Sequence, residues 1–167
     1  SSVHGRRGEQ LFFNAATGNL MVSQRDEFLV GPGLDTAVDR IYNSKGDLSD
    51  DNGDNWRQGY DKRIVNLTGN LNSTGSTVQR VSSDGSLITY SWDVSRNSYV
   101  AKDGAGAYDT LTNSGGVWTW TDGDAQIKEA YTAYGAYWRL SSQSDTDGNT
   151  TNFAYTDDKL TQVITAD

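Results

Sequence analysis

The sequence predicts an all-β chain of consecutive antiparallel hairpins that form a curved sheet. Asp-Gly pairs begin at residues 84, 103, 122 and 147, and this dipeptide suits hairpin turns because Gly accepts positive φ and Asp hydrogen-bonds its own backbone. Runs rich in Tyr, Trp, Val, Ile and Thr separate the pairs, as half-buried strands require. Helix signals are almost wholly missing, and most acidic residues are Asp, a poor helix former.

The first elements are short strands joined by turns. Two strands within residues 10–22 flank a turn at 16–19, and a second turn at 31–33 follows the apolar run 27–30. Residues 34–42 alternate as a half-buried strand does, except at Arg40, which indicates a salt bridge or a two-sided strand. Residues 43–55 are too polar for a strand or helix and are expected to form a surface loop. Strand chemistry returns over 56–65, with Trp56 and Tyr60 as apolar anchors.

The rest of the chain reads as a meander of short strands. We expect them at residues 67–71, 77–82, 87–94, 98–102, 108–112, 117–121, 126–132, 137–142, 151–155 and 160–165. Residues 124–134 are the one candidate for a short helix, although strand is favoured. In the run 117–121, Trp118 and Trp120 share one face and smaller side chains share the other. This pattern is typical of a sheet covered on both faces or curled around a lumen.

Composition excludes several classes of protein. The chain has no Cys, which excludes a zinc ribbon, a disulfide framework and a thiol nucleophile. Its net charge of −8 argues against a nucleic-acid groove, which needs clustered Arg and Lys. No run approaches the roughly 18 apolar residues of a membrane-spanning helix. The start without Met and the turn that begins near residue 164 favour a piece of a longer protein.

Sequence signals for catalysis or metal binding are weak. Residues 50–55 offer oxygen ligands for calcium, but the EF-hand register fails because Leu48 stands at its first position. Glu129, near Tyr131 and Tyr134, is the one carboxylate placed for glycoside hydrolysis. His4 lies near a terminus, where the burial that a catalytic triad needs is not expected. We therefore expect no catalytic residue, no metal site and no cofactor.

Four segments carry motifs of a known repeat family. Residues 14–20 match N-x-x-T-G-N-L, residues 40–44 match R-x-Y-N-S, and residues 56–60 match W-x-x-G-Y. Residues 145–164 are similar to the unit D-x-x-G-N-x-x-x-Y-x-Y-D-x-x-G-x-L-x-x-V, with Thr156 in place of Asp and Lys159 where Gly precedes Leu. Together these segments resemble RHS proteins, also called YD-repeat proteins, over about residues 14–167.

The resemblance implies a scaffold. Members of this family wrap β-hairpin ribbons into a hollow shell around a C-terminal toxin or other effector domain. It implies a lead-in at residues 1–13, an RHS-type segment at 14–65 with the polar loop 43–55, and degenerate YD-like hairpins at 66–167. The family's self-cleaving aspartyl motif is not matched. The expected protein is non-catalytic and secreted or at the cell surface, and its partners are the remaining repeats of the polypeptide and the enclosed effector.

An aromatic cluster leaves a second function open. The rings of Trp118, Trp120, Tyr134, Tyr137 and Trp138 could stack on sugars in a carbohydrate-binding adhesin, with a glycan as partner, or could pack the core. The shell hypothesis predicts that the aromatic side chains are mostly buried and that the last strand has an unpaired edge. The adhesin hypothesis predicts at least two coplanar, exposed rings from this cluster.

Overall fold

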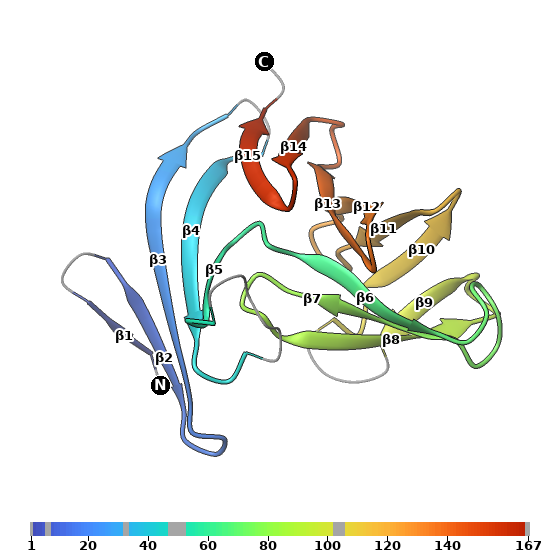
Figure 1. The fold of residues 1–167 in the computed structure, drawn as a ribbon, viewed down its shortest axis with the longest axis horizontal. Coiled ribbons are helices and arrows are strands. Elements are labelled where there is room, and N and C mark those ends of the chain that lie inside the picture. The colour runs from blue at the N-terminus through green and yellow to red at the C-terminus, as the bar shows by residue number, and fades with distance from the viewer. Residues whose placement is uncertain (1, 6–7, 32–33, 47–52, 102–105, 166–167) are drawn as a thin grey trace.

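The chain is all-β, as predicted. A computed structural model describes residues 2–5, 8–31, 34–46, 53–101 and 106–165. Within these ranges it forms fifteen strands and no helix, and every strand pairing is antiparallel. In the segment 124–134, where the sequence favours a strand over a short helix, the structure has a strand over Lys128–Tyr134. Consecutive hairpins therefore build the fold (Figure 1).

The first five strands form a separate open sheet. Its strands follow chain order: β1 (Ser2–His4), β2 (Gln10–Asn14), β3 (Asn19–Leu29), β4 (Thr36–Asn43) and β5 (Trp56–Gln58). Arg40, which breaks the alternation of β4, pairs with Asp26 on β3, so the salt-bridge interpretation is confirmed. The polar loop lies between β4 and β5, but its residues 47–52 lie outside the described ranges, as do Pro32 and Gly33.

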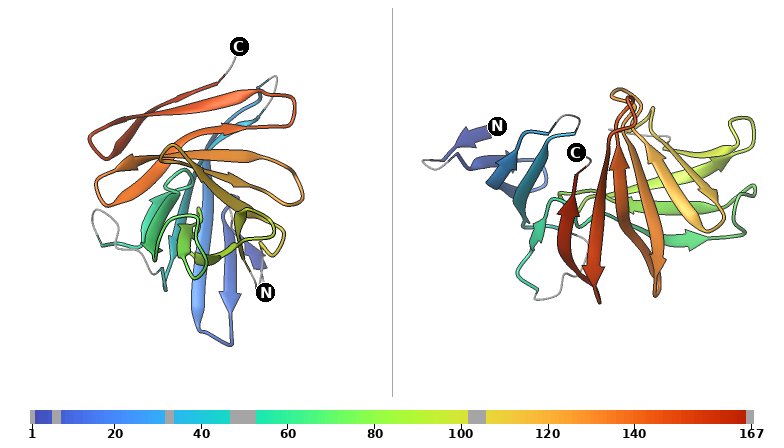
Figure 2. Two further views of the ribbon diagram at one scale, coloured as in Figure 1. Left: turned by 90° about the vertical axis from the view of Figure 1, so that its right-hand side faces the viewer. Right: turned by 90° about the horizontal axis from the view of Figure 1, so that it is seen from above.

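The other ten strands form a second sheet, and most of it closes on itself. Its strands are β6 (Arg63–Thr68), β7 (Thr77–Val81), β8 (Leu87–Asp93), β9 (Ser98–Ala101), β10 (Thr110–Ser114), β11 (Val117–Thr121), β12 (Lys128–Tyr134), β13 (Tyr137–Ser144), β14 (Thr150–Thr156) and β15 (Lys159–Ile164). Each of β6 to β13 pairs with the next, and β13 also pairs with β6. These eight strands therefore close into a barrel (Figure 2).

The last hairpin leaves this closed sheet at β13. One edge of β13 pairs with β12 along its length. The other edge is shared: Trp138 lies opposite Ile64 of β6, whereas Ser142 lies opposite Asn152 of β14. The β14–β15 hairpin thus diverges from the barrel, and among the described strands β15 pairs only with β14. The last strand therefore has one unpaired edge.

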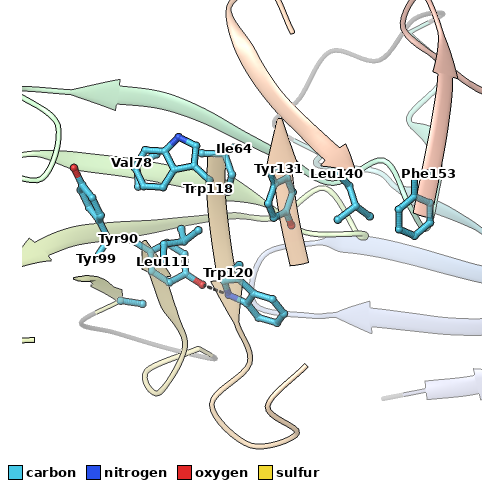
Figure 3. Packing of buried hydrophobic residues seen from close by; sticks show 11 residues of the cluster. Ile64, Val78, Tyr90, Tyr99, Leu111, Trp118, Trp120, Tyr131, Leu140 and Phe153 are labelled. Carbon is cyan, nitrogen blue, oxygen red and sulfur yellow. Dashed lines mark hydrogen bonds between the residues drawn. The ribbon is translucent and has the colours of Figure 1, made fainter. Parts of the chain in front are cut away.

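The interior of the closed sheet is filled by side chains. Trp118 and Trp120 share one face of β11, as the sequence pattern predicted, and this face points into the barrel while Val117 lies outside. Eight-stranded barrels leave just enough interior space for side chains to fill. Figure 3 shows the buried cluster, whose members are Ile64, Val78, Tyr90, Tyr99, Ala101, Leu111, Trp118, Trp120, Tyr131, Leu140 and Phe153.

The tightest turns of the described residues are not at the three Asp-Gly pairs that the structure describes. Two-residue connections occur at Gly115–Gly116, Gly135–Ala136 and Asp157–Asp158, and both φ angles of the first are positive, as a type I′ turn requires. The pairs at 84, 122 and 147 lie in connections of five or six residues, and the pair at 103 lies outside the described residues. Asp side chains in these longer loops cap backbone N–H groups instead.

The diglycine turn carries the first prediction. Gly116 has φ of 85° and no neighbour within 4 Å of an added Cβ, so Gly116→Ala should cost only the left-handed backbone strain, about 1–2 kcal/mol. The measurement is the free energy of unfolding in urea. Gly46→Ala is the control, because Gly46 has no positive φ and the added Cβ would meet ordinary contacts, the nearest at 3.5 Å. Equal losses in both variants would contradict the proposed turn type.

Three contacts join the open sheet to the closed one. The side-chain amide of Asn43 donates to the backbone carbonyl of Asp84 at 2.7 Å. Arg57 is buried against the turn at Gly85, where an added Cβ would lie 3.1 Å from the guanidinium. Tyr60 lies in the segment between β5 and β6, which links the two sheets. Its ring packs against that of Phe153 on β14, with 4.7 Å between the ring centroids. The β7–β8 connection and strand β14 of the second sheet therefore contact the first sheet and the segment that follows it.

Candidate functional site

A buried ionic network occupies part of the barrel interior. Glu129 is 1% exposed. Its Oε1 lies 2.5 Å from Nζ of Lys62, and its Oε2 lies 2.7 Å from Nη2 of Arg80. The Tyr131 hydroxyl donates to the same Oε2 and accepts from Nε of Arg80 at 3.0 Å. The Arg80 guanidinium also lies 3.9 Å from the ring centroid of Trp120, so its charge is compensated on several sides.

The network fixes the charges of its members. Burial alone would raise the pKa of Glu129, but the positive charges of Lys62 and Arg80 outweigh it and lower that pKa to about 2. Burial opposes the charged form of Arg80, yet its contacts with Tyr131 and Glu129 raise its pKa. Burial and the adjacent carboxylate raise the pKa of Tyr131 well above its usual value. The carboxylate is ionised and the phenol is neutral at physiological pH.

This arrangement suits charge compensation better than proton transfer. A glycosidase acid needs a raised pKa so that it holds a proton near neutrality. Glu129, the carboxylate that the sequence placed nearest to such a role, has a lowered pKa and both oxygens engaged. Its surroundings therefore favour a structural role.

Two of the predicted stacking rings lie in the barrel core. Trp118 has no exposed surface, and Trp120 is buried and donates its indole N–H to the Tyr90 hydroxyl at 3.1 Å (Figure 3). Trp118 meets Tyr99 and Trp138 edge to face, at 5.1 and 6.0 Å between centroids. Neither Trp118 nor Trp120 has a face open to a ligand.

The other three rings are half-buried. Tyr134 and Tyr137 lie opposite each other at the β12–β13 turn, with their planes 62° apart, and Trp138 turns its ring to Trp118 and donates its indole N–H to the Gly116 carbonyl. The five residues are thus not one coplanar platform. Sugar stacking on the half-buried rings stays a prediction.

Arginine side chains cover the aromatic surface around β13. Arg139 and Arg63 lie opposite each other on β13 and β6, where like charges repel. The Arg139 guanidinium lies 4.2 Å from the ring centroid of Tyr134 and 4.3 Å from that of Tyr155. Arg63 lies over Tyr137 at 4.6 Å and pairs with Asp61 at 2.8 Å. These cation–π and ion-pair contacts offset the repulsion and attach the last hairpin to the barrel.

The N-terminal motif residues hold the open sheet together. Oδ1 of Asn14 accepts the backbone N–H groups of residues 16 and 17, and Gly18 has the positive φ that this turn requires. Ser44 donates to the Asn19 side chain at 2.9 Å and accepts from the N–H of Leu20 at the same distance. The N-x-x-T-G-N-L and R-x-Y-N-S motifs therefore meet across β3 and β4.

The W-x-x-G-Y segment closes the edge of the same sheet. Trp56 packs against Tyr42 at 5.5 Å between ring centroids. Gly59 donates its N–H to the Asp39 carbonyl at 2.8 Å, an approach that leaves an added Cβ only 3.3 Å from the Asp39 side chain. The Tyr60 hydroxyl accepts from the N–H of Ala37 at 3.2 Å. Each specified position of this motif thus has a packing or turn contact.

The C-terminal repeat-like unit uses its polar residues in one turn. Asp145 accepts the N–H groups of Asp147 and Asn149 at 3.0 and 2.9 Å and the Asn149 side-chain amide at 2.8 Å. The hydrogen bond from Asn149 is the main cause of the lowered pKa of Asp145. Gly148 takes φ of 88°. Phe153 enters the core and Tyr155, Leu160 and Val163 pack against it.

The remaining candidate sites are His4 and the calcium loop, and in the described ranges neither is part of a cluster of metal-binding side chains. His4 lies on β1, at the edge of the open sheet. Residues 50–52 of the calcium candidate lie outside the described ranges, and the described residues contain no group of three His, Asp or Glu side chains placed to hold a metal. A search of the described residues also finds no helix long and apolar enough to cross a membrane.

Sequence reasoning missed the ionic network as a unit. Its signal was a charged residue at an inward position of an alternating strand: Arg80 follows Val78 by two residues, and Glu129 precedes Tyr131 by two. Such a position indicates a paired charge. Strand alternation does not reveal the partner, because β7 and β12 are not adjacent in the sheet.

Fold and site together define an all-β module whose polar residues serve turns, ion pairs and sheet junctions. Residues 13–90 match a family model described as a domain of unknown function, DUF6531. The match begins in β2 and ends in β8, so it spans the open sheet, the junction and the first strands of the barrel. It also contains the three N-terminal motifs. No curated protein matches the chain.

Proposed function

We propose that this chain is a non-catalytic structural segment of an RHS-type, or YD-repeat, protein that is secreted or at the cell surface. In this role it forms part of a β-shell that encloses or presents a C-terminal toxin or effector domain. The observation that carries the proposal is the β14–β15 hairpin. It holds the repeat-like unit, leaves the closed sheet at β13, and ends in a strand with one unpaired edge.

The use of the motif residues supports a scaffold role. Five motif residues make turn or sheet contacts: Asn14, Ser44, Gly59, Tyr60 and Asp145. A motif kept for catalysis would direct some of these side chains into a shared pocket. Here they lie at separate turns and strand edges, where they fix the path of the ribbon.

The surface of the open sheet supports further packing. Its buried apolar core contains Ile41, while large apolar side chains are exposed where β3 ends and β4 begins, among them Leu29 at 61% and Val38 at 39%. A sheet normally buries one face against another layer, and a large exposed apolar patch marks an interaction site. In the proposed shell, other parts of the same polypeptide cover this surface.

Hydrogen exchange tests whether the ribbon continues. Amide exchange of β15 is compared between the 167-residue chain and the longer polypeptide from which we propose it derives. If a following strand pairs with β15, its outward N–H groups become hydrogen-bonded and their exchange should slow at least tenfold. Exchange of β11, which is paired on both edges within the barrel, is the internal control and should not change. Equal exchange of β15 in both contexts would contradict the shell.

Protease protection tests the enclosed domain. In the longer polypeptide, a C-terminal effector inside a shell should resist proteolysis until denaturant opens the sheets, and then be cleaved together with them. A C-terminal region that is cleaved at once, while residues 63–165 remain intact, would exclude enclosure and leave only presentation.

A further inference from the structure

A cavity of about 270 Å³ lies at one end of the barrel. It forms where the β7–β8, β9–β10 and β11–β12 connections come together, since side chains from all three connections or their strands line it. The hydrogen bond from the Gly123 N–H to Oδ1 of Asp109, 3.0 Å long, ties two of these connections to each other. Mouths of barrels are common places for small-molecule sites.

Two glycines allow the connections to meet closely around this space. Gly106 has φ of 110°, and an added Cβ would lie 2.9 Å from Oδ2 of Asp109. At Gly123 an added Cβ would lie 2.4 Å from Cβ of Tyr108. Side chains at these positions would displace the groups that line the cavity. The local sequence is therefore fitted to this shape.

The wall of the cavity offers unused hydrogen-bond acceptors. Asp109, Asp122 and Asp124 all line it. Oδ1 of Asp122 accepts the N–H groups of Asp124 and Ala125 at 2.8 and 2.6 Å, which fixes the turn. Within the part of the chain that the structure describes, the second oxygens of Asp109 and Asp122 and the whole Asp124 carboxylate accept no hydrogen bond.

Arg80 and Tyr108 give two other parts of the cavity a different chemistry from the carboxylates. Arg80 is buried and lines the deep side. Its Nε, Nη1 and Nη2 each make one hydrogen bond within the protein, which leaves two of the five guanidinium N–H groups. Tyr108 lines the cavity from the rim and is 81% exposed. An exposed ring of this kind presents a face for stacking.

This combination restricts the ligand. Three carboxylates repel an anion. The charge of Arg80 is compensated by Glu129, but its remaining N–H groups need an acceptor, which a simple cation does not offer. The carboxylates do not gather as a metal site, and Ile88 is the one aliphatic side chain among the lining residues, so an apolar ligand would gain little. A neutral polyhydroxylated ring fits, because each hydroxyl both donates to a carboxylate and accepts from a guanidinium.

We propose that the cavity binds a neutral sugar of about monosaccharide size. At roughly 30 Å³ per water molecule, the volume holds about nine waters, which is the scale of one sugar ring with its hydroxyls. The sugar hydroxyls face the three aspartates and Arg80, and the C–H face of the ring stacks on Tyr108. This binding goes beyond the scaffold role and does not depend on it.

Calorimetry and saturation-transfer NMR with the 167-residue chain test this site. The probes are glucose, galactose, mannose and N-acetylglucosamine, with glycine and ethylammonium as a zwitterion and a cation. At least one sugar should bind with a roughly millimolar Kd, as expected for so small a ligand. Tyr108→Ala and Asp124→Asn should each weaken that binding at least tenfold. Both variants should fold, because Tyr108 is 81% exposed and the Asp124 carboxylate accepts no hydrogen bond among the described residues.

Matched variants separate this site from other surfaces. Val94→Ala removes an exposed side chain from the β8–β9 turn at the other end of the barrel, and Asp147→Asn neutralises an exposed turn aspartate of β13–β14. Both should bind sugar as the parent chain does. The proposal is overturned by binding of no sugar, by binding of glycine or ethylammonium alone, or by sugar binding that survives both Tyr108→Ala and Asp124→Asn.

Discussion

Replacing Glu129 by glutamine is expected to lower the free energy of unfolding by about 3–5 kcal/mol, as removal of one partner from a buried ion pair does. The variant keeps the shape of the side chain but leaves the Arg80 charge in the barrel without its carboxylate. Urea denaturation at pH 7 measures the loss. Glu27→Gln is the matched control, because Glu27 is exposed on β3 and should change stability by less than about 0.5 kcal/mol.

A double variant shows whether the loss comes from uncompensated charge. Replacing Arg80 by methionine together with Glu129 by leucine removes the two most deeply buried charges and leaves Lys62, whose side chain is 17% exposed, in contact with water. Such replacements of buried pairs are often neutral or stabilising. The double variant should therefore be more stable than Glu129→Gln alone. If both are equally destabilised, packing around the two side chains rather than charge pairing explains the effect.

The same pair predicts an acid-sensitive stability. The folded pKa of Glu129 is about 2, below its ordinary value of 4.5, so the unfolded chain binds the proton first. The stabilisation, on the order of 3 kcal/mol, is complete above pH 4.5 and is lost as the pH falls toward 2. The free energy of unfolding, measured at several pH values between 5 and 2, should therefore fall less with decreasing pH for Glu129→Gln than for the parent chain. Identical slopes would place the proton on another group.

Truncation of Trp118 to alanine is expected to cost about 3–5 kcal/mol. Trp118 has no exposed surface and contacts Tyr99 and Trp138 edge to face, so the cavity left behind would lie in the centre of the aromatic cluster. Guanidinium denaturation followed by circular dichroism measures the loss. Val117→Ala is the control. Val117 lies on the outer face of the same strand and is 38% exposed, so its truncation should cost less than about 1 kcal/mol.

The comparison of these neighbours tests the inward and outward assignment of β11. A larger loss of stability for Val117→Ala than for Trp118→Ala would mean that the register of β11 is shifted by one residue, which places Val117 on the inner face. Trp118→Phe refines the test, because the indole N–H of Trp118 has no hydrogen-bond partner among the described residues. Phenylalanine keeps most of the ring and loses no hydrogen bond, so it should recover most of the stability.

Local sequence patterns predicted the strands well and the turns less well. The strand 117–121 has its predicted bounds, and most other strands lie within two residues of theirs, because alternation and β-branched or aromatic residues are local signals. The first strand predicted after residue 65 is an exception. Residues 67–71 were expected to form it, but β6 covers Arg63–Thr68, and the positive φ of Gly69 marks its end.

Closure of the barrel and the ionic network depend on distant partners, and no local pattern contains them. The pairing of β6 with β13 joins strands with the other six of the ring between them. Glu129 meets Arg80 and Lys62 only because that closure occurs. The sequence grouped five aromatic residues, but which of these rings face inward depended on the register of β11 and β13. The cavity at the barrel mouth is built from three connections and was not predicted.

The shared edge of β13 has a consequence for how the chain folds as it is synthesised. Strands β6 to β12 can pair with their neighbours as soon as they emerge, yet β6 and β12 keep open edges until β13 is made. Exposed strand edges invite association with other chains. Residues 137–144 therefore act as a late closing element, and a ribosome stalled before them would carry an open sheet. A nascent chain ending near residue 136 should need a chaperone more than one that ends near residue 145.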